Sequence, residues 1–233
     1  MQTSLFAGKF RIIFSRDAFR IESLGNRYVV VSKAPDWKVS AYNPLSKTLY
    51  ESEVRSFKGD LASGTAALGG YLENLPLLVA PKKPTRYLSE NAFKLHVENP
   101  SPLHVAKKSP TKNFNSVFFN SGDIMSADYW TWNLPDVPAT LPIVVNKIYK
   151  LPVGREFPLK LLTLNTENET HLELDTGMIR QIPLEPAIFN VPPNLRIVKT
   201  DIEIANDRRR QNSVKNLINN WDDWGKIVDT GKP

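Results

Sequence analysis

Residues 18–51, AFRIESLGNRYVVVSKAPDWKVSAYNPLSKTLYE, decide the fold class of this chain. Apolar and polar side chains alternate along residues 18–22 and 37–42, which is the period of a strand with one buried face. Residues 28–31 and 47–51 are rich in β-branched and aromatic side chains, which favour extended backbone. Turn-forming residues separate the four segments: Gly25-Asn26, Ala34-Pro35-Asp36 and Asn43-Pro44-Leu45-Ser46. Strands joined by such short turns pair antiparallel, so the stretch predicts an antiparallel meander.

The same patterns continue on both sides of this stretch. Further strands are predicted at residues 10–14, 92–97, 115–119, 128–132, 157–165, 171–174 and 178–182. Turns are predicted at residues 165–168 and at Asp175-Thr176-Gly177, and residues 184–192 are expected to form a strand or an extended segment. The strands between residues 157 and 182 therefore predict a second antiparallel meander.

Helices are expected to be few. Residues 141–149 carry an apolar stripe, with Pro142 near the start, where proline is tolerated. Residues 59–80 have apolar residues at helical spacing but also several glycines, which predicts a helix-loop segment. Residues 206–225 predict an exposed amphipathic helix with Asp207 as its N-cap. Many strands with two or three helices indicate an α+β fold.

Length and composition limit the possible function classes. The chain has 233 residues, of which 41% are hydrophobic and 23% are charged, as in folded soluble proteins. It contains no cysteine, which excludes disulfides, thiolate metal sites and thiol catalysis. No apolar run approaches the roughly 20 residues of a transmembrane helix. Residues 1–200 are expected to form one domain with a basic, proline-rich insertion at 80–113, and residues 201–233 a C-terminal extension.

The charge distribution bears on possible partners. The formal net charge is +6, and the excess of Lys and Arg lies in residues 1–120. A cationic half favours an anionic partner, such as a phospholipid surface or a membrane protein complex, whereas a solvated surface without a partner is the alternative. Nucleic acid is not expected as a partner, because the sequence has no recognisable nucleic-acid-binding motif.

Motifs that would support catalysis are weak. The triplet Asp175-Thr176-Gly177 matches the aspartic-protease signature, but that chemistry needs two aspartates that share one proton. A single copy between predicted strands is more typical of a turn. The spacing of the histidines fits no metal-binding pattern: His96, His104 and His171. The protein is therefore expected not to be an enzyme and to need no metal or cofactor.

Aromatic and aliphatic residues on the predicted strands are the remaining candidates. Filling of the core is the default explanation for each of them. The alternative is a strongly curved sheet that leaves an apolar hollow, where burial of an acyl chain gains about 0.8 kcal/mol per CH₂ without any catalytic group. The residues predicted to line this hollow are Phe10, Phe14, Tyr28, Val30, Trp37, Val39, Tyr50, Trp130, Trp132, Tyr149 and Leu161.

The predicted C-terminal helix carries the candidates for partner docking. Its apolar residues follow helical spacing along a narrow stripe, and the rest of the helix is polar. Such a helix would lie on the domain or on a partner. The residues predicted to dock are Arg208, Arg209, Leu217, Trp221 and Trp224.

Several segments, in their order along the chain, resemble LolA-like domains, the outer-membrane lipoprotein carriers. The opening segments are residues 16–22 (RDAFRIE), 28–32 (YVVVS), 39–44 (VSAYNP) and 47–50 (KTLY). The closing segments are residues 158–161 (PLKL), 172–182 and 186–192 (PAIFNVP). Phe189 and Pro192 are similar to the F-x-x-P ending of that family. The resemblance covers roughly residues 5–200.

The resemblance implies a strongly curved, mainly antiparallel half-barrel, with a few helices covering its concave face. That face would bind lipoprotein acyl chains or other hydrophobic ligands in the periplasm. This chain departs from the family in its basic insertion, its additional helix and the lack of a recognisable signal peptide. The expected localisation is therefore periplasmic, with the signal peptide removed, and the alternative is cytoplasmic.

The expected function is non-enzymatic binding of a hydrophobic ligand in a concave apolar cavity, in the role of an envelope carrier. The alternative is a structural or accessory subunit that docks on a larger membrane-associated assembly. In that case, the basic loop and the C-terminal helix would make the contacts.

Overall fold

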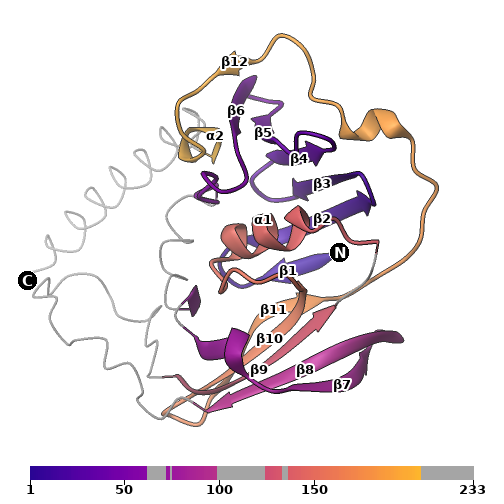
Figure 1. The fold of residues 1–233 in the computed structure, drawn as a ribbon. Helices are drawn as coiled ribbons and strands as arrows, with labels where there is room; N and C mark the ends of the chain where they lie inside the picture. The colour runs from indigo at the N-terminus through magenta and orange to yellow at the C-terminus, as the bar shows by residue number, and fades with distance from the viewer. Residues whose placement is uncertain (62–71, 74, 99–123, 133–135, 206–233) are drawn as a thin grey trace, which may run out of the picture.

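The computed structural model describes residues 1–61, 72–73, 75–98, 124–132 and 136–205. Twelve strands within these residues form one open sheet in the order β12-β6-β5-β4-β3-β2-β1-β11-β10-β9-β8-β7 (Figure 1). Every pair is antiparallel except β12 with β6. The strands are β1 Gln2–Ser4, β2 Gly8–Ser15, β3 Ala18–Ser23, β4 Val29–Lys33, β5 Val39–Asn43, β6 Thr48–Ser52, β7 Lys82–Tyr87, β8 Glu90–Glu98, β9 Ile124–Trp132, β10 Phe157–Asn165, β11 Thr170–Thr176 and β12 Arg196–Ile197.

The first predicted meander is confirmed as β2 to β6, with neighbours paired in sequence order. Only Arg16 and Asp17 separate β2 from β3, whereas the three later turns are longer than the tight turn expected at Gly25-Asn26. The left-handed backbone lies at Arg27 (φ 57°), Trp37 (φ 52°) and Lys47 (φ 53°), ten residues apart each time. The three later turns of this meander therefore share one feature, a left-handed residue that is not glycine.

The second meander differs from the prediction at its third strand. Residues 178–182 are not a strand, and Asp175 and Thr176 belong to β11 rather than to a turn. The neighbour of β11 is β1, which pairs Gln2 with Thr176 and Ser4 with Leu174. Because β1 also pairs with β2, this short N-terminal strand joins the two meanders into one sheet.

The basic segment that was predicted as an insertion contributes a hairpin. Residues 82–98 form β7 and β8, which continue the sheet beyond β9. Pro84 lies inside β7, and the strand tolerates it because β7 is an edge strand with a partner on one side. The predicted strand at residues 115–119 and most of the remaining insertion lie outside the described residues.

The predicted helix at residues 141–149 is confirmed as α1, Thr140–Tyr149, which ends at Lys150 in left-handed backbone (φ 56°). The described part of residues 59–80 includes a short 3₁₀ helix, η2, Pro76–Val79. Residues 184–192 are not a strand, because Pro186–Phe189 form the 3₁₀ helix η4. A short helix, α2, follows at Ile202–Ala205. Among the described residues, we find no helix with the length and apolarity needed to cross a bilayer.

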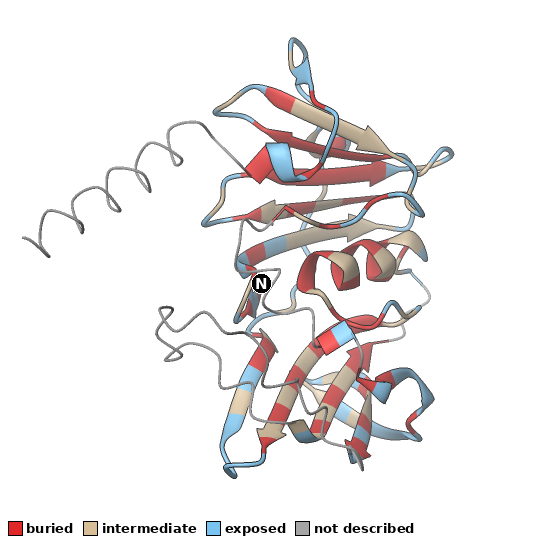
Figure 2. Cartoon of the chain, turned by 90° about the vertical axis from the view of Figure 1, so that its left-hand side faces the viewer, coloured by how far each residue is buried: buried red, intermediate tan, exposed pale blue. Residues whose placement is uncertain are grey.

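The two faces of the sheet have different covers. The core face carries Phe10, Ile21, Val30 and Leu161, and α1 packs against it in front of β1 and β2 (Figure 1). The buried side of α1 and the buried strand residues lie against each other (Figure 2). On the opposite face, the chain around η4 covers β3 to β6, where a smaller apolar cluster forms: Val29, Val31 and Tyr42, with Leu49, Val191 and Leu195.

One contact shows how strongly the sheet bends near β7. Three strands separate β7 from β11, which corresponds to about 19 Å in a flat sheet. Nevertheless, Tyr87 Oη donates to Asp175 Oδ1 at 2.6 Å and to the carbonyl oxygen of Thr176 at 3.2 Å. A tyrosine side chain cannot span the flat distance, so the β7–β8 hairpin curls toward β11.

Candidate functional site

The structure brings the eleven predicted lining residues into one apolar cluster. Seven of them are buried members of that cluster: Phe10, Tyr28, Val30, Val39, Trp132, Tyr149 and Leu161. The other four are half-buried and pack against it: Phe14, Trp37, Tyr50 and Trp130. They come from both meanders and from α1, so residues far apart in the sequence share this site.

Ring contacts connect the two meanders within this cluster. The Phe10 ring lies 5.2 Å from the Tyr149 ring of α1 and 6.2 Å from the Tyr28 ring of the first meander, between ring centroids. Phe14 and Trp132 are 6.3 Å apart in an edge-on arrangement. Aromatic pairs at these separations attract each other beyond their area of burial. The rings therefore fix α1 and both meanders around a common centre.

Trp130 is the exception in orientation. Its direct neighbours across the sheet are Lys94 and Lys160, and both ammonium groups lie over its ring, at 4.8 and 5.4 Å from the centroid. The adjacent residues Tyr129 and Thr131 are buried on the other side of β9. Trp130 thus touches the cluster from the opposite face of the sheet and is not placed to line a hollow on the core face.

A series of buried hydrogen bonds connects α1 to the sheet. Tyr149 Oη donates to Gln2 Oε1 at 3.0 Å, and Gln2 Nε2 donates to the Pro158 carbonyl oxygen at 2.6 Å and to Thr176 Oγ1 at 2.9 Å. Thr176 Oγ1 donates in turn to the Leu159 carbonyl oxygen at 2.6 Å. Burial raises the pKa of Tyr149 well above its ordinary value, so the phenol stays a neutral donor. Sequence patterns did not identify Gln2, since nothing marks a buried glutamine near a chain start.

A second set of hydrogen bonds holds the segment after β6 against the end of α1. Lys147 Nζ donates to three backbone carbonyl oxygens, of Val54 at 2.9 Å, Arg55 at 3.0 Å and Phe57 at 2.7 Å. Burial, followed by the charge of Lys150, lowers the pKa of Lys147. The lysine that interrupts the apolar stripe of α1 in the sequence is therefore a structural anchor.

The polar groups that resembled catalytic motifs in the sequence all have structural partners where the structure describes them. Asp175 accepts the hydrogen bond from Tyr87, and His96 contacts Asp128 at 2.7 Å and Glu98 at 2.8 Å. No group of three or more potential ligands in the described part of the chain is arranged to hold a metal ion. His104 lies outside that part.

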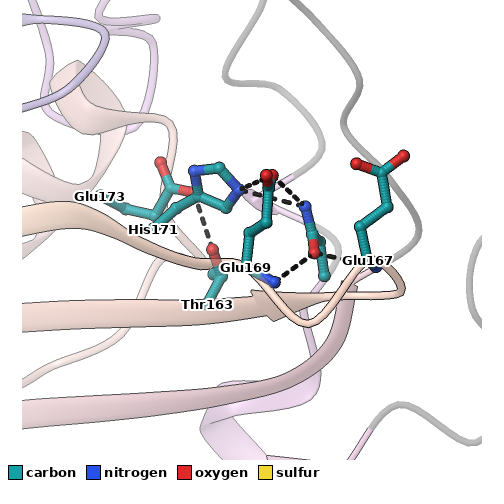
Figure 3. Close-up of polar contacts among 6 residues, drawn as sticks. Thr163, Glu167, Glu169, His171 and Glu173 are labelled. Carbon is teal, nitrogen blue, oxygen red and sulfur yellow. Dashed lines mark hydrogen bonds and ion pairs between the residues drawn. The ribbon is translucent and has the colours of Figure 1, made fainter.

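The turn between β10 and β11 gathers the remaining histidine (Figure 3). Asn165 organises this turn, because its Oδ1 accepts from the backbone N–H of Glu167 at 3.0 Å and of Glu169 at 2.8 Å. Asn165 Nδ2 lies 3.2 Å from His171 Nε2, and Glu169 Oε2 lies 3.6 Å from the same ring nitrogen. His171 therefore contacts the residues of the turn predicted at 165–168.

The five predicted docking residues lie outside the described residues: Arg208, Arg209, Leu217, Trp221 and Trp224. Their role in binding a partner stays a prediction.

Comparisons with known proteins add little to this geometry. No protein-family model matches the chain, and no curated protein matches it. A solved structure of an uncharacterized conserved protein from Thermus thermophilus aligns over 78% of this chain and 80% of that chain, with 11% identity and a TM-score of 0.29. A likeness at that level carries no argument. None of these findings points to the lipoprotein-carrier family, so that resemblance stays a prediction.

Proposed function

We propose that this protein binds a hydrophobic ligand, such as a lipid or a lipoprotein acyl chain, on the core face of its open sheet. One observation carries the proposal. The apolar cluster on that face is continuous from Val39 in β5 to Leu95 in β8, across a sheet that does not close on itself. Ligand sites in proteins are mostly concave and lined by apolar side chains, and a bent open sheet with this lining could provide such a site.

Within the part of the chain that the structure describes, short elements cover this face, which supports the proposal. With ten residues, α1 is about 15 Å long, whereas twelve strands at their usual spacing extend over about 50 Å. Other buried side chains over the core come from a loop and from η2, including Phe57, Leu61 and Leu77. Short elements are displaced more readily than a long helix, and an acyl chain would take their place.

The chemistry of the face favours binding rather than catalysis. The lining groups are aliphatic and aromatic, and the buried polar groups Gln2 and Tyr149 hydrogen-bond to each other. Burial of a hydrocarbon chain supplies about 0.8 kcal/mol per CH₂ and needs no charged group. We further propose that the sheet forms a half-barrel with helices over its concave face. In this proposal the protein acts as a carrier in the periplasm.

A titration with a fluorescent fatty acid tests the proposal. We expect a saturable increase in emission with one site per chain, reversed by an unlabelled fatty acid. Emission that rises without saturation, or that an unlabelled fatty acid does not reverse, would contradict the proposal.

Two neighbouring residues on β6 provide a matched pair of variants for this titration. Tyr50 is half-buried against the core cluster, whereas Leu49 is half-buried against the small cluster on the opposite face. Tyr50→Ser should weaken fatty-acid binding several-fold, and Leu49→Ser should leave it unchanged. Circular dichroism establishes that both variants fold. Equal losses in the two variants would show that binding does not depend on the core face.

The alternative function, an accessory subunit of a membrane-associated assembly, depends on the basic segment at 80–113 and on the C-terminal helix, which lies outside the described residues. Native mass spectrometry distinguishes the two functions, because a carrier retains a lipid mass and an accessory subunit retains stoichiometric protein partners.

A further inference from the structure

An apolar turn protrudes where η2 meets the loop before β10. Leu78 is 53% exposed and Val79 is 84% exposed, and Val153, on the other loop, is 49% exposed. The two loops touch, because a Cβ added to Gly154 would lie only 2.8 Å from Leu78 Cδ2. We call Leu78, Val79 and Val153 the apolar turn.

The base of this turn is anchored in the core. Leu75 and Leu77, on either side of Pro76, are buried members of the main apolar cluster. The backbone N–H of Ala80 closes the turn on the Leu77 carbonyl oxygen at 3.3 Å. The anchored leucines hold Leu78 and Val79 toward solvent, where exposure of a contiguous aliphatic patch is unfavourable unless something covers it.

Cations flank the apolar turn on both loops. Lys82 and Lys83 begin β7 two residues after the turn, and Arg155 follows Val153 on the second loop. Lys82 is paired with Glu156, whereas Lys83 and Arg155 are exposed and have no carboxylate within 4.0 Å among the described residues. Exposed aliphatic side chains with cations close by on the same two loops match a bilayer with an anionic surface, where apolar groups enter the interface and cations meet lipid phosphates.

We propose that the apolar turn docks this protein on an anionic lipid surface, with Leu78, Val79 and Val153 in the interface and Lys83 and Arg155 at the headgroups. The inference does not depend on the proposed binding of a fatty acid. It fits that function, because a carrier must meet a membrane to exchange its ligand.

The lack of cysteine allows a site-specific test in the full chain. A polarity-sensitive fluorophore is attached to Val79→Cys and, as a matched control, to Leu45→Cys in the β5–β6 turn, where the leucine is 58% exposed. Vesicles of phosphatidylcholine with phosphatidylglycerol should shift the emission of the Val79 label to shorter wavelength. The Leu45 label should not respond.

Unlabelled variants measure the contribution of each part by vesicle co-sedimentation. Val79→Asp should lower the affinity for anionic vesicles at least tenfold, Lys83→Glu should lower it several-fold, and Leu45→Asp should have no effect. Added salt should weaken binding, and phosphatidylcholine vesicles alone should bind poorly.

Four results would overturn the inference: no binding of anionic vesicles, equal binding of neutral vesicles, equal effects of Val79→Asp and Leu45→Asp, or a dimer that Val79→Asp dissociates. The last result would identify the apolar turn as a contact between copies of the chain. Fatty-acid binding by Val79→Asp is measured separately. If the native chain binds vesicles but does not bind fatty acid, that result would contradict only the proposed function.

Discussion

At the scale of single residues, two lysines fix the end of α1 in addition to its buried apolar stripe. Lys147 Nζ donates to three carbonyl oxygens of the segment after β6, and Lys150 Nζ donates to Asp60 Oδ1 at 2.7 Å. Such charge-assisted hydrogen bonds are among the stronger ones in proteins. A single lysine in an apolar stripe does not reveal these partners in the sequence, because they lie about ninety residues away.

Gly59 is the residue that permits this close approach. Its backbone has φ +74°, and a Cβ would lie 2.5 Å from the carbonyl carbon and oxygen of Lys147. Gly59→Ala should therefore lower the free energy of unfolding by about 2 kcal/mol or more. Gly177→Ala, where a Cβ meets nothing within 4 Å, should change it by less than about 0.5 kcal/mol. Urea unfolding measures both, and equal effects would contradict the close packing at Gly59.

His96 gives the chain a local pH dependence. Hydrogen bonds to Glu98, and then to Asp128, raise its pKa above the ordinary value. Because the folded pKa exceeds the unfolded one, this contribution to stability is complete below the unfolded pKa and is lost as pH rises through the folded pKa. Nuclear magnetic resonance of the imidazole protons should show the raised pKa, and Asp128→Asn should lower this pKa while the contribution of Glu98 remains. A pKa unchanged by Asp128→Asn would contradict the contact. The effect on stability is small, because the side chain is 48% exposed.

At the scale of elements, sequence patterns predicted a strand well when residues next to it in the sequence form the turn at its end. Strand β10 has the predicted bounds, and Asn165 at its end organises the turn through its own side chain. The failure at residues 178–182 has a different cause. A strand needs a partner, and the site next to β11 is occupied by β1, from the far end of the sequence. Periodicity reports a strand's faces, but it does not report its neighbour.

The role of β1 is tested at Gln2. Gln2→Ala leaves the Tyr149 hydroxyl and the Pro158 carbonyl without their buried partner, so we expect a loss of about 2–4 kcal/mol in the free energy of unfolding. Thr3→Ala on the same strand is exposed and should change it little. Thermal unfolding compares the two variants. A Gln2→Ala protein as stable as Thr3→Ala would contradict the fastening of β1 to α1.

The curl of the β7–β8 hairpin is tested at Tyr87. Burial, and then Asp175, raises the pKa of this phenol, so it remains a donor. Tyr87→Phe removes its hydrogen bonds to β11 and should speed amide exchange in β7 and β8, with no change in β3 and β4. Hydrogen exchange read by mass spectrometry resolves these segments. Unchanged protection in β7 would mean that packing alone bends the hairpin.

At the scale of the whole molecule, the meanders become one sheet through three residues of β1, and one apolar cluster unites them. Sequence patterns named eleven residues of this cluster, most of them on strands where core-facing residues repeat every second position. It did not show on which face of β9 Trp130 lies, because alternation does not say which of two half-buried faces is covered. The bend at β7 was also invisible, because it depends on a contact across three intervening strands.

The central claim is that the core face holds an apolar ligand, and native mass spectrometry of the full chain, purified without detergent, tests it most directly. We expect a species above the 26.4 kDa chain, whose additional mass is released by gentle activation and identified as a lipid or fatty acid. A chain that appears only at its own mass, both as purified and after incubation with fatty acid, would contradict the account.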